Sequence, residues 1–332
     1  MASNTKKRTL DAFFKPPQKK PRLSETEGSL EAREYGGKSS EQHVSLLLLE
    51  YPMLKTERID RQLTSLPSTS GKAINDQADL DLLYFQPYIP RYLERDVFQF
   101  LRKELPFYRV EYKIKRYGVE TDIRYTTVFG LDETSCFNED GEVVHAKTGL
   151  PVKKDDYARY PPRPIPKCLD ELRTSTEVAT GCKFNFCLVN YYASGSDSIS
   201  YHSDDERFLG PDPAIASFSL GAKRDFLMKH KPVPPNDNAP PPPETTPIKL
   251  PLASGDMILM KGRTQANWLH SIPKRTGKNA DDGGRINITF RKAMVKGGTD
   301  NYYNYNVGTG PVFKWDSTSR EMKLWKANSA ST

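Results

Sequence analysis

The second half of the chain is divided into short alternating segments by glycine and proline, and this pattern restricts the fold more than any other feature. From Lys183 onward it predicts seven strands, at 183–192, 198–202, 214–220, 224–230, 247–252, 256–261 and 284–292. Turn signals such as Gly210-Pro211 and Gly255-Asp256 separate them. Many short strands of this kind favour a double-sheet barrel or jelly roll over a doubly wound parallel sheet.

The segments before residue 180 predict flanking helices and one pair of strands. We expect the folded body to begin near Leu80, and apolar residues at helical spacing predict helices over 91–105 and 169–178. Two alternating runs, 112–117 and 124–129, predict strands joined through Gly118. The predicted fold class is therefore α+β, with helices beside a jelly-roll core.

The first 75 residues have a different composition. They lack sustained periodicity and are rich in Lys, Ser, Thr, Glu and Pro, which predicts a mostly disordered tail. Residues 1–22 hold seven Lys and Arg against one Asp, so most of the net charge of +7 lies there and says little about what the body binds. The sequence has no apolar run of about 18 residues and no secretory core, which predicts a soluble intracellular protein. Its four cysteines show no C-x-x-C pairing, so we expect neither a disulfide framework nor a zinc knuckle.

Two histidines and an aspartate are candidate metal ligands. In an extended segment His202 and Asp204 point to the same side, where an imidazole and a carboxylate can hold a divalent metal. The same pair also occurs by chance on solvated loops. His270 would add a second imidazole, although a lone histidine is more often an ordinary core or surface residue.

The segment 285–291 alternates without a break. Its apolar residues share one face, and the opposite face carries Arg285, Asn287, Thr289 and Arg291. On an outer sheet surface this polar face would simply be solvated. Facing inward, its two guanidinium groups would need an anion, and arginine is suited to bidentate binding of carboxylates. Two histidines and one carboxylate leave open positions for iron(II), oxygen and a cosubstrate, whereas a zinc hydrolase would give the arginine strand no role.

The combined motif order resembles a known enzyme family. Asn190-x-Tyr192, His202-x-Asp204, His270 and the strand 285–291 together resemble the AlkB family of iron(II)- and 2-oxoglutarate-dependent dioxygenases, and are most similar to its eukaryotic DNA-repair branch. The resemblance is strong over about 180–293 and weak over about 80–180. It implies a double-stranded β-helix in a dioxygenase domain at 80–295, with its jelly-roll core at about 180–293. It also implies a nucleotide-recognition lid at about 107–165 and leaves 296–332 as a C-terminal extension.

The resemblance also implies cofactors, a reaction and site residues. Iron(II) would be bound by His202, Asp204 and His270. Arg285 and Arg291 would clamp the carboxylates of 2-oxoglutarate, with hydrogen bonds from Asn190, Tyr192, Asn287 and Thr289. With O2 and 2-oxoglutarate, the enzyme would oxidise the N-methyl group of bases such as 1-methyladenine or 3-methylcytosine in DNA, and would release formaldehyde, succinate and CO2. An RNA demethylase of the same chemistry is the first alternative, and a non-catalytic, clamp-associated DNA-binding factor is the second.

A methylated base inside a duplex must be flipped out to reach a buried metal. The resemblance implies that an inserted side chain fills the gap that the flipped base leaves in the duplex, and it places Tyr117 in this role; the alternative is that Tyr117 is an aromatic side chain packed at the turn. Asp205 and Glu206 are expected to contact either the edge of the flipped base or the groups that surround the metal ligands. Tyr157 or Tyr160 is expected to stack on the base. Arg124 and Arg224 complete the predicted substrate-binding set.

Two short segments of the tail suggest partners and location. Residues 7–14 resemble the sliding-clamp (PCNA) binding peptide of replication and repair proteins, with Leu10, Phe13 and Phe14 as its apolar plug and Lys7 where that motif usually has Gln. Residues 19–22 form either a nuclear-import patch or an ordinary solvated basic run. We therefore expect a nuclear monomer that acts on alkylated DNA.

Overall fold

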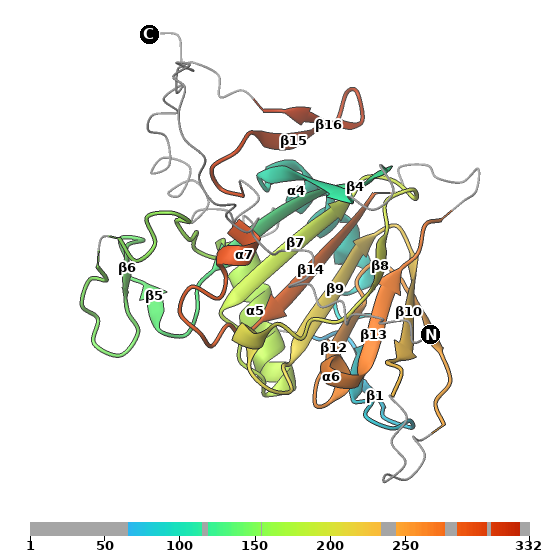
Figure 1. The fold of residues 1–332 in the computed structure, drawn as a ribbon. Helices are drawn as coiled ribbons and strands as arrows, with labels where there is room; N and C mark the ends of the chain where they lie inside the picture. The colour runs from blue at the N-terminus through green and yellow to red at the C-terminus, as the bar shows by residue number, and fades with distance from the viewer. Residues whose placement is uncertain are drawn as a thin grey trace, which may run out of the picture.

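The computed structural model describes residues 66–114, 119–153, 155–233, 244–275, 284–303 and 307–325. Ten of the described strands form one large sheet in the order β1-β2-β12-β9-β14-β7-β4-β3-β15-β16 (Figure 1). These strands are β1 (Lys72–Ile74), β2 (Leu82–Phe85), β3 (Phe107–Ile114), β4 (Val119–Gly130), β7 (Phe186–Tyr192), β9 (Ile215–Gly221), β12 (Met257–Met260), β14 (Arg285–Arg291), β15 (Val312–Asp316) and β16 (Glu321–Leu324).

A smaller sheet lies beside the large one, in the order β11-β10-β13-β8. It consists of β8 (Ile199–His202), β10 (Arg224–His230), β11 (Ile248–Leu252) and β13 (Trp268–Ile272). A two-stranded hairpin, β5 (Ser135–Phe137) and β6 (Val143–His145), projects from the body. The helical segments are α4 (Arg91–Glu104), α5 (Lys167–Thr180), η1 (Arg207–Leu209), α6 (Thr264–Asn267) and α7 (Asp300–Tyr303). None of the described helices is long and apolar enough to cross a membrane.

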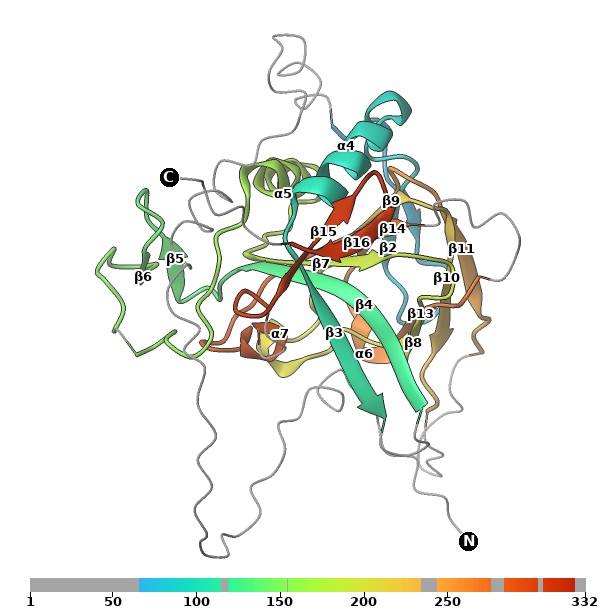
Figure 2. The ribbon, with the colours of Figure 1, turned by 90° about the horizontal axis from the view of Figure 1, so that it is seen from above.

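Helices α4 and α5 lie on one side of the large sheet, as Figure 2 shows from above. Their apolar faces, with Leu101 and Leu169 among the buried residues, pack in one cluster with Ile286, Ile288 and Phe290 of β14. The prediction that these three residues face the core is therefore confirmed. Because successive side chains alternate across a strand, the polar residues of β14 point to the opposite face, toward the second sheet.

The strand pattern predicted for residues 183–292 is confirmed, since each of the seven predicted strands is present within about three residues of its predicted ends. The two predicted helices are also present, and the predicted strand pair is found as β3 and β4, each beginning about five residues earlier than predicted, whereas residues 115–118, with the predicted joint at Gly118, lie outside the described residues. The sequence did not predict β13, which carries His270. Strand β13 begins directly after α6, a helix of only four residues. Because no glycine or proline separates the two, the sequence does not mark where the strand begins.

Both ends of the predicted domain extend further than expected. Strand β1 lies before residue 75 yet pairs with β2, so the sheet begins inside the predicted tail. In the C-terminal extension, β15 pairs with β3 at Val312↔Tyr108 and Phe313↔Phe107, which makes the extension part of the large sheet. The ring of Trp315 lies 3.8 Å from the Arg102 guanidinium of α4, which fixes the hairpin to the body.

Candidate active site

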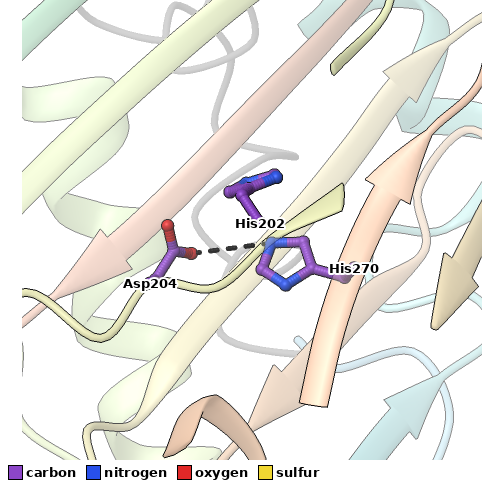
Figure 3. Close-up of side chains that lie close together, drawn as sticks. All are labelled: His202, Asp204 and His270. Carbon is purple, nitrogen blue, oxygen red and sulfur yellow. Dashed lines mark ion pairs between the residues drawn. The ribbon is translucent and has the colours of Figure 1, made fainter. Parts of the chain in front are cut away.

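The three predicted metal ligands lie together between the two sheets (Figure 3). Strands β8 and β13 pair so that His202 stands directly opposite His270, with ring centroids 4.2 Å apart. Asp204 follows β8, and one ligand atom from each of the three side chains lies within 4.8 Å of the others. Among the described residues this is the one such group of His, Cys, Asp or Glu side chains.

The electrostatics of this triangle suit a divalent cation. All three side chains are buried. Burial lowers the pKa of His270 to about 3, and His202 adds to the effect, so the imidazole is neutral at pH 7. Burial alone would raise the pKa of Asp204, but Arg291, His270 and His202 together outweigh it and hold this pKa below its ordinary value. The site therefore offers neutral imidazole and ionised carboxylate, which are the protonation states that metal binding requires.

Neighbouring groups orient the three ligands. His202 Nδ1 lies 2.8 Å from the carbonyl oxygen of Ser200, so the tautomer that donates there carries its lone pair on Nε2. The ring of Phe226 stacks on His270 with centroids 5.3 Å apart. Arg291 Nη2 donates to Asp204 Oδ1 at 2.9 Å, and the backbone N–H of Asp204 donates to the side-chain oxygen of Gln265 at 2.9 Å.

The polar face of β14 points inward. Arg285 and Arg291 are 1% and 3% exposed, which excludes the alternative of a solvated outer surface. Antiparallel pairing with β7 places Arg285 opposite Tyr192 and Asn287 opposite Asn190. The predicted cosubstrate contacts are thus brought onto adjacent strands of one sheet face.

The two arginines have donors that the described residues do not satisfy. Arg285 Nη2 donates to Ser219 Oγ at 2.9 Å, but its Nε and Nη1 have no hydrogen-bond partner there, and the same two nitrogens of Arg291 have none. Burial lowers the pKa of Arg285 to about 10, so it remains charged at pH 7. Arg291 already has the Asp204 carboxylate, but the unused donors of both buried cations can bind a further anion, and a dicarboxylate such as 2-oxoglutarate suits them.

The remaining polar residues of this face have protein partners. Asn287 donates to Ser217 Oγ at 2.9 Å, Asn190 Oδ1 accepts from Thr126 Oγ1 at 2.8 Å, and Thr289 donates to the Leu188 carbonyl at 3.1 Å. The ring of Tyr192 lies 5.4 Å from the Arg285 guanidinium. Asn190 is therefore held by β4, a strand of the predicted lid.

The structure places several of the predicted substrate residues in supporting roles. The Tyr157 hydroxyl lies within hydrogen-bonding distance of Asp132 Oδ2 and Ser135 Oγ, at 3.2 and 3.1 Å, at the start of the β5–β6 hairpin. Arg224 is 2% exposed and donates to three backbone carbonyls, those of Ser194, Asp197 and Pro273. These hydrogen bonds of Tyr157 and Arg224 hold loops together. They also use the polar atoms that each side chain would need to bind a base or a phosphate.

Asp205, Glu206 and Tyr160 have different surroundings. Asp205 accepts from Lys231 at 2.9 Å, whereas Glu206 is 1% exposed and turned toward Tyr302. Burial, with Asp204 nearby, raises the pKa of Glu206 above its ordinary value. Tyr160 is partly buried against the core cluster between the sheets. Tyr117 lies outside the described residues, as does the side chain of Arg124.

Several residues that shape the site were not predicted. Ser217 and Ser219 of β9 contact Asn287 and Arg285, and their alternation with apolar Ala216, Phe218 and Leu220 is a signal that could have placed them on the polar face. Gln265 and Thr126 carry no comparable signal, because their contacts depend on long-range packing.

Comparison with known proteins agrees with this geometry. The sequence profile of the 2OG-Fe(II) oxygenase superfamily matches residues 81–291. The "DNA oxidative demethylase ALKBH2" of Arabidopsis thaliana is 31% identical over 253 residues, which cover 69% of this chain and 72% of that protein. The Homo sapiens protein of the same name is 40% identical over 134 residues, covering 40% of this chain and 49% of that protein. The Rattus norvegicus "Alpha-ketoglutarate-dependent dioxygenase alkB homolog 3" is 41% identical over 141 residues, covering 41% and 45%.

The matched segment spans about half the length of the two mammalian relatives but most of the plant relative. The profile match also covers both the His–Asp–His triangle and the arginine strand. The chain belongs to the 2OG-Fe(II) oxygenase superfamily and, within it, to the AlkB family of iron(II)- and 2-oxoglutarate-dependent dioxygenases.

Proposed function

We propose that this dioxygenase removes alkyl groups oxidatively from N-alkylated bases, such as 1-methyladenine and 3-methylcytosine, in DNA. The observation that carries the chemistry is the pair of buried arginines with unused donors beside the His–Asp–His triangle. The substrate class is supported by relatives named DNA oxidative demethylase.

In this proposal, His202, Asp204 and His270 hold iron(II), which with O2 and 2-oxoglutarate supplies the oxidation of the N-methyl group. The methyl carbon would be released as formaldehyde, with 2-oxoglutarate converted to succinate and CO2. Arg291, which already bonds Asp204, would offer its unused donors to one carboxylate of 2-oxoglutarate, and Arg285 would offer its own to the other. The burial of these side chains excludes water, which strengthens each of these charged contacts.

A basic surface supports a polyanionic substrate. A cavity of about 280 Å³ is lined by Lys223, Arg224, Asp225, Pro273, Lys274 and Arg275, and because Arg224 is buried against loop carbonyls, three exposed cations stand here against one acid. Lys223, Lys274 and Arg275 are exposed, and the last two follow β13, the strand that carries His270. Such a cluster suits the phosphate backbone of a nucleic acid, which carries one negative charge per nucleotide.

Neutralising this basic surface is expected to weaken substrate binding without affecting the metal. In a variant with Lys223→Gln, Lys274→Gln and Arg275→Gln, we expect the affinity for methylated duplex DNA to fall about tenfold at low salt. The slope of log affinity against log salt should fall by about one for each phosphate group that the variant no longer neutralises. Fluorescence anisotropy over a salt series measures both quantities.

The matched control replaces three exposed lysines elsewhere, Lys103, Lys147 and Lys323, by glutamine. Equal losses of affinity in the two triple variants would mean that only overall charge matters, and this would contradict a specific phosphate-binding surface.

The proposed reaction is tested by product analysis. The purified chain with iron(II), 2-oxoglutarate and air should convert 1-methyladenine in a DNA duplex to adenine and release formaldehyde and succinate in equal amounts. RNA of the same sequence is assayed in parallel, and faster turnover of RNA would favour an RNA demethylase. If neither substrate is converted by fully metal-loaded enzyme, the proposed function is wrong.

We extend the proposal to residues 7–22 of the tail, which lie outside the described residues. Leu10, Phe13 and Phe14 bind the sliding clamp, residues 19–22 direct the chain to the nucleus, and the enzyme acts as a monomer.

Phe13→Ala with Phe14→Ala is expected to abolish clamp binding, measured by calorimetry, while demethylation in solution stays at the wild-type rate. Unchanged clamp binding would refute the assignment of residues 7–14, and cellular repair that needs these phenylalanines but not His202 would favour a non-catalytic factor.

A further inference from the structure

The chain continues beyond residue 291, where the superfamily profile ends, and the next segment packs against Phe208, four residues after Asp204. The backbone N–H of Met294 donates to the Phe208 carbonyl at 2.8 Å, and a Cβ added to Gly298 would stand 2.4 Å from Phe208 Cβ. Tyr302 of α7 is 4% exposed, with its ring 6.0 Å from that of Phe208 and 5.2 Å from that of Phe186. The segment 294–302 therefore packs against the loop that follows Asp204.

Tyr302 contacts two groups of the active site. Its hydroxyl donates to Glu206 Oε1 at 2.5 Å, and the Arg291 guanidinium lies 5.5 Å from the centre of its ring. Glu206 is buried, and its Oε2 has no hydrogen-bond partner among the described residues. Tyr302 thus gives a donor to a buried carboxyl group that interacts electrostatically with Arg291 of the proposed clamp.

We propose that Tyr302 is a positioning residue for Arg291 and, through it, for 2-oxoglutarate. Arg291 already bonds Asp204 and has two more nitrogens to offer an incoming carboxylate. A buried Glu206 carboxyl without a donor would compete for that guanidinium, because a charge-assisted hydrogen bond is roughly twice as strong as a neutral one. By donating to Glu206, Tyr302 keeps Arg291 directed at Asp204 and the cosubstrate. This inference rests on the proposed assignment of Arg291 to the 2-oxoglutarate clamp.

The variant Tyr302→Phe tests the role of the hydroxyl, because it keeps the ring. Binding of 2-oxoglutarate is measured by calorimetry on the full chain loaded with Mn(II), which needs no turnover. We expect the Kd for 2-oxoglutarate to rise about tenfold and the Kd for Mn(II) to change by less than about threefold. In turnover assays, the KM for 2-oxoglutarate should rise while kcat at saturation stays close to that of the wild type.

A second substitution tests whether Glu206 is the competitor. Adding Glu206→Gln to Tyr302→Phe replaces the carboxyl by a neutral amide, which is a weaker acceptor for a guanidinium. The double variant is therefore expected to bind 2-oxoglutarate within about threefold of the wild-type affinity. A double variant as weak as Tyr302→Phe would overturn the proposed competition.

The matched control is Tyr88→Phe, which removes a buried hydroxyl that pairs with Ser175 Oγ at 2.8 Å. This variant should lower the melting temperature without changing 2-oxoglutarate affinity. If Tyr302→Phe behaves in the same way, Tyr302 is only a core residue and the inference is wrong. If replacement of Arg291 itself leaves 2-oxoglutarate binding unchanged, the clamp assignment has failed and the role of Tyr302 fails with it.

Discussion

Replacement of His202 by alanine is expected to lower demethylation turnover more than about 100-fold. The imidazole stands opposite His270 in the β8–β13 pairing, and Asp204 lies two residues further along the chain. Its loss leaves one imidazole and one carboxylate, and even outer partners of metal ligands are typically worth roughly 10–100-fold in metal affinity or activity. Metal affinity, measured by calorimetry with Mn(II), should fall in parallel with turnover.

His145→Ala is the matched control for this variant, because it removes an exposed imidazole on β6. Turnover of this control should equal that of the wild type. A His202→Ala protein that is folded and keeps wild-type turnover would show that the chemistry happens elsewhere.

The two arginines of β14 are expected to respond differently to substitution. Arg285→Lys keeps the charge but loses the planar fork, so we expect the Kd for 2-oxoglutarate to rise about 10- to 100-fold with metal binding unchanged. Arg291→Met removes the donors offered to 2-oxoglutarate and also leaves the buried Asp204 carboxylate without its cation. Its free energy of unfolding should therefore fall by about 3–5 kcal/mol, together with a loss of metal and cosubstrate binding.

Chemical denaturation measures the stability of these variants, and calorimetry measures ligand binding. Arg163→Lys is the control, because Arg163 is a buried arginine that donates to Tyr108 and Thr127 away from the metal ligands. It should lose stability but keep its affinity for 2-oxoglutarate. Identical behaviour of Arg285→Lys and Arg163→Lys would mean that Arg285 is structural and does not bind the cosubstrate.

The strands, and the side of β14 that faces the core, could be predicted because they depend on the local alternation of apolar and polar residues. The apolar side of residues 285–291 packs against α4 and α5, which turns both arginines inward, and the same reasoning aligned His202 with Asp204. The parts of the candidate site that lie within one short segment, such as residues 285–291, could therefore be predicted from the sequence.

The contacts between distant segments were not predictable in this way. Gln265 bonds the backbone of Asp204 from another part of the chain, and Tyr302 reaches Glu206 from beyond the family match. Pairing of β15 with β3 likewise joins segments separated by about 200 residues. Such contacts follow from tertiary packing, so a local sequence pattern cannot predict them. For the same reason Arg224, predicted from its motif to bind substrate, is found bonded to three loop carbonyls.

The most direct test of the composite site is a crystal structure of the chain with Mn(II) and 2-oxoglutarate, grown without O2. We predict the metal bound by His202, Asp204 and His270, and 2-oxoglutarate with one carboxylate on Arg291 and the other on Arg285. A metal bound by other side chains, or a cosubstrate that contacts neither arginine, would contradict the account.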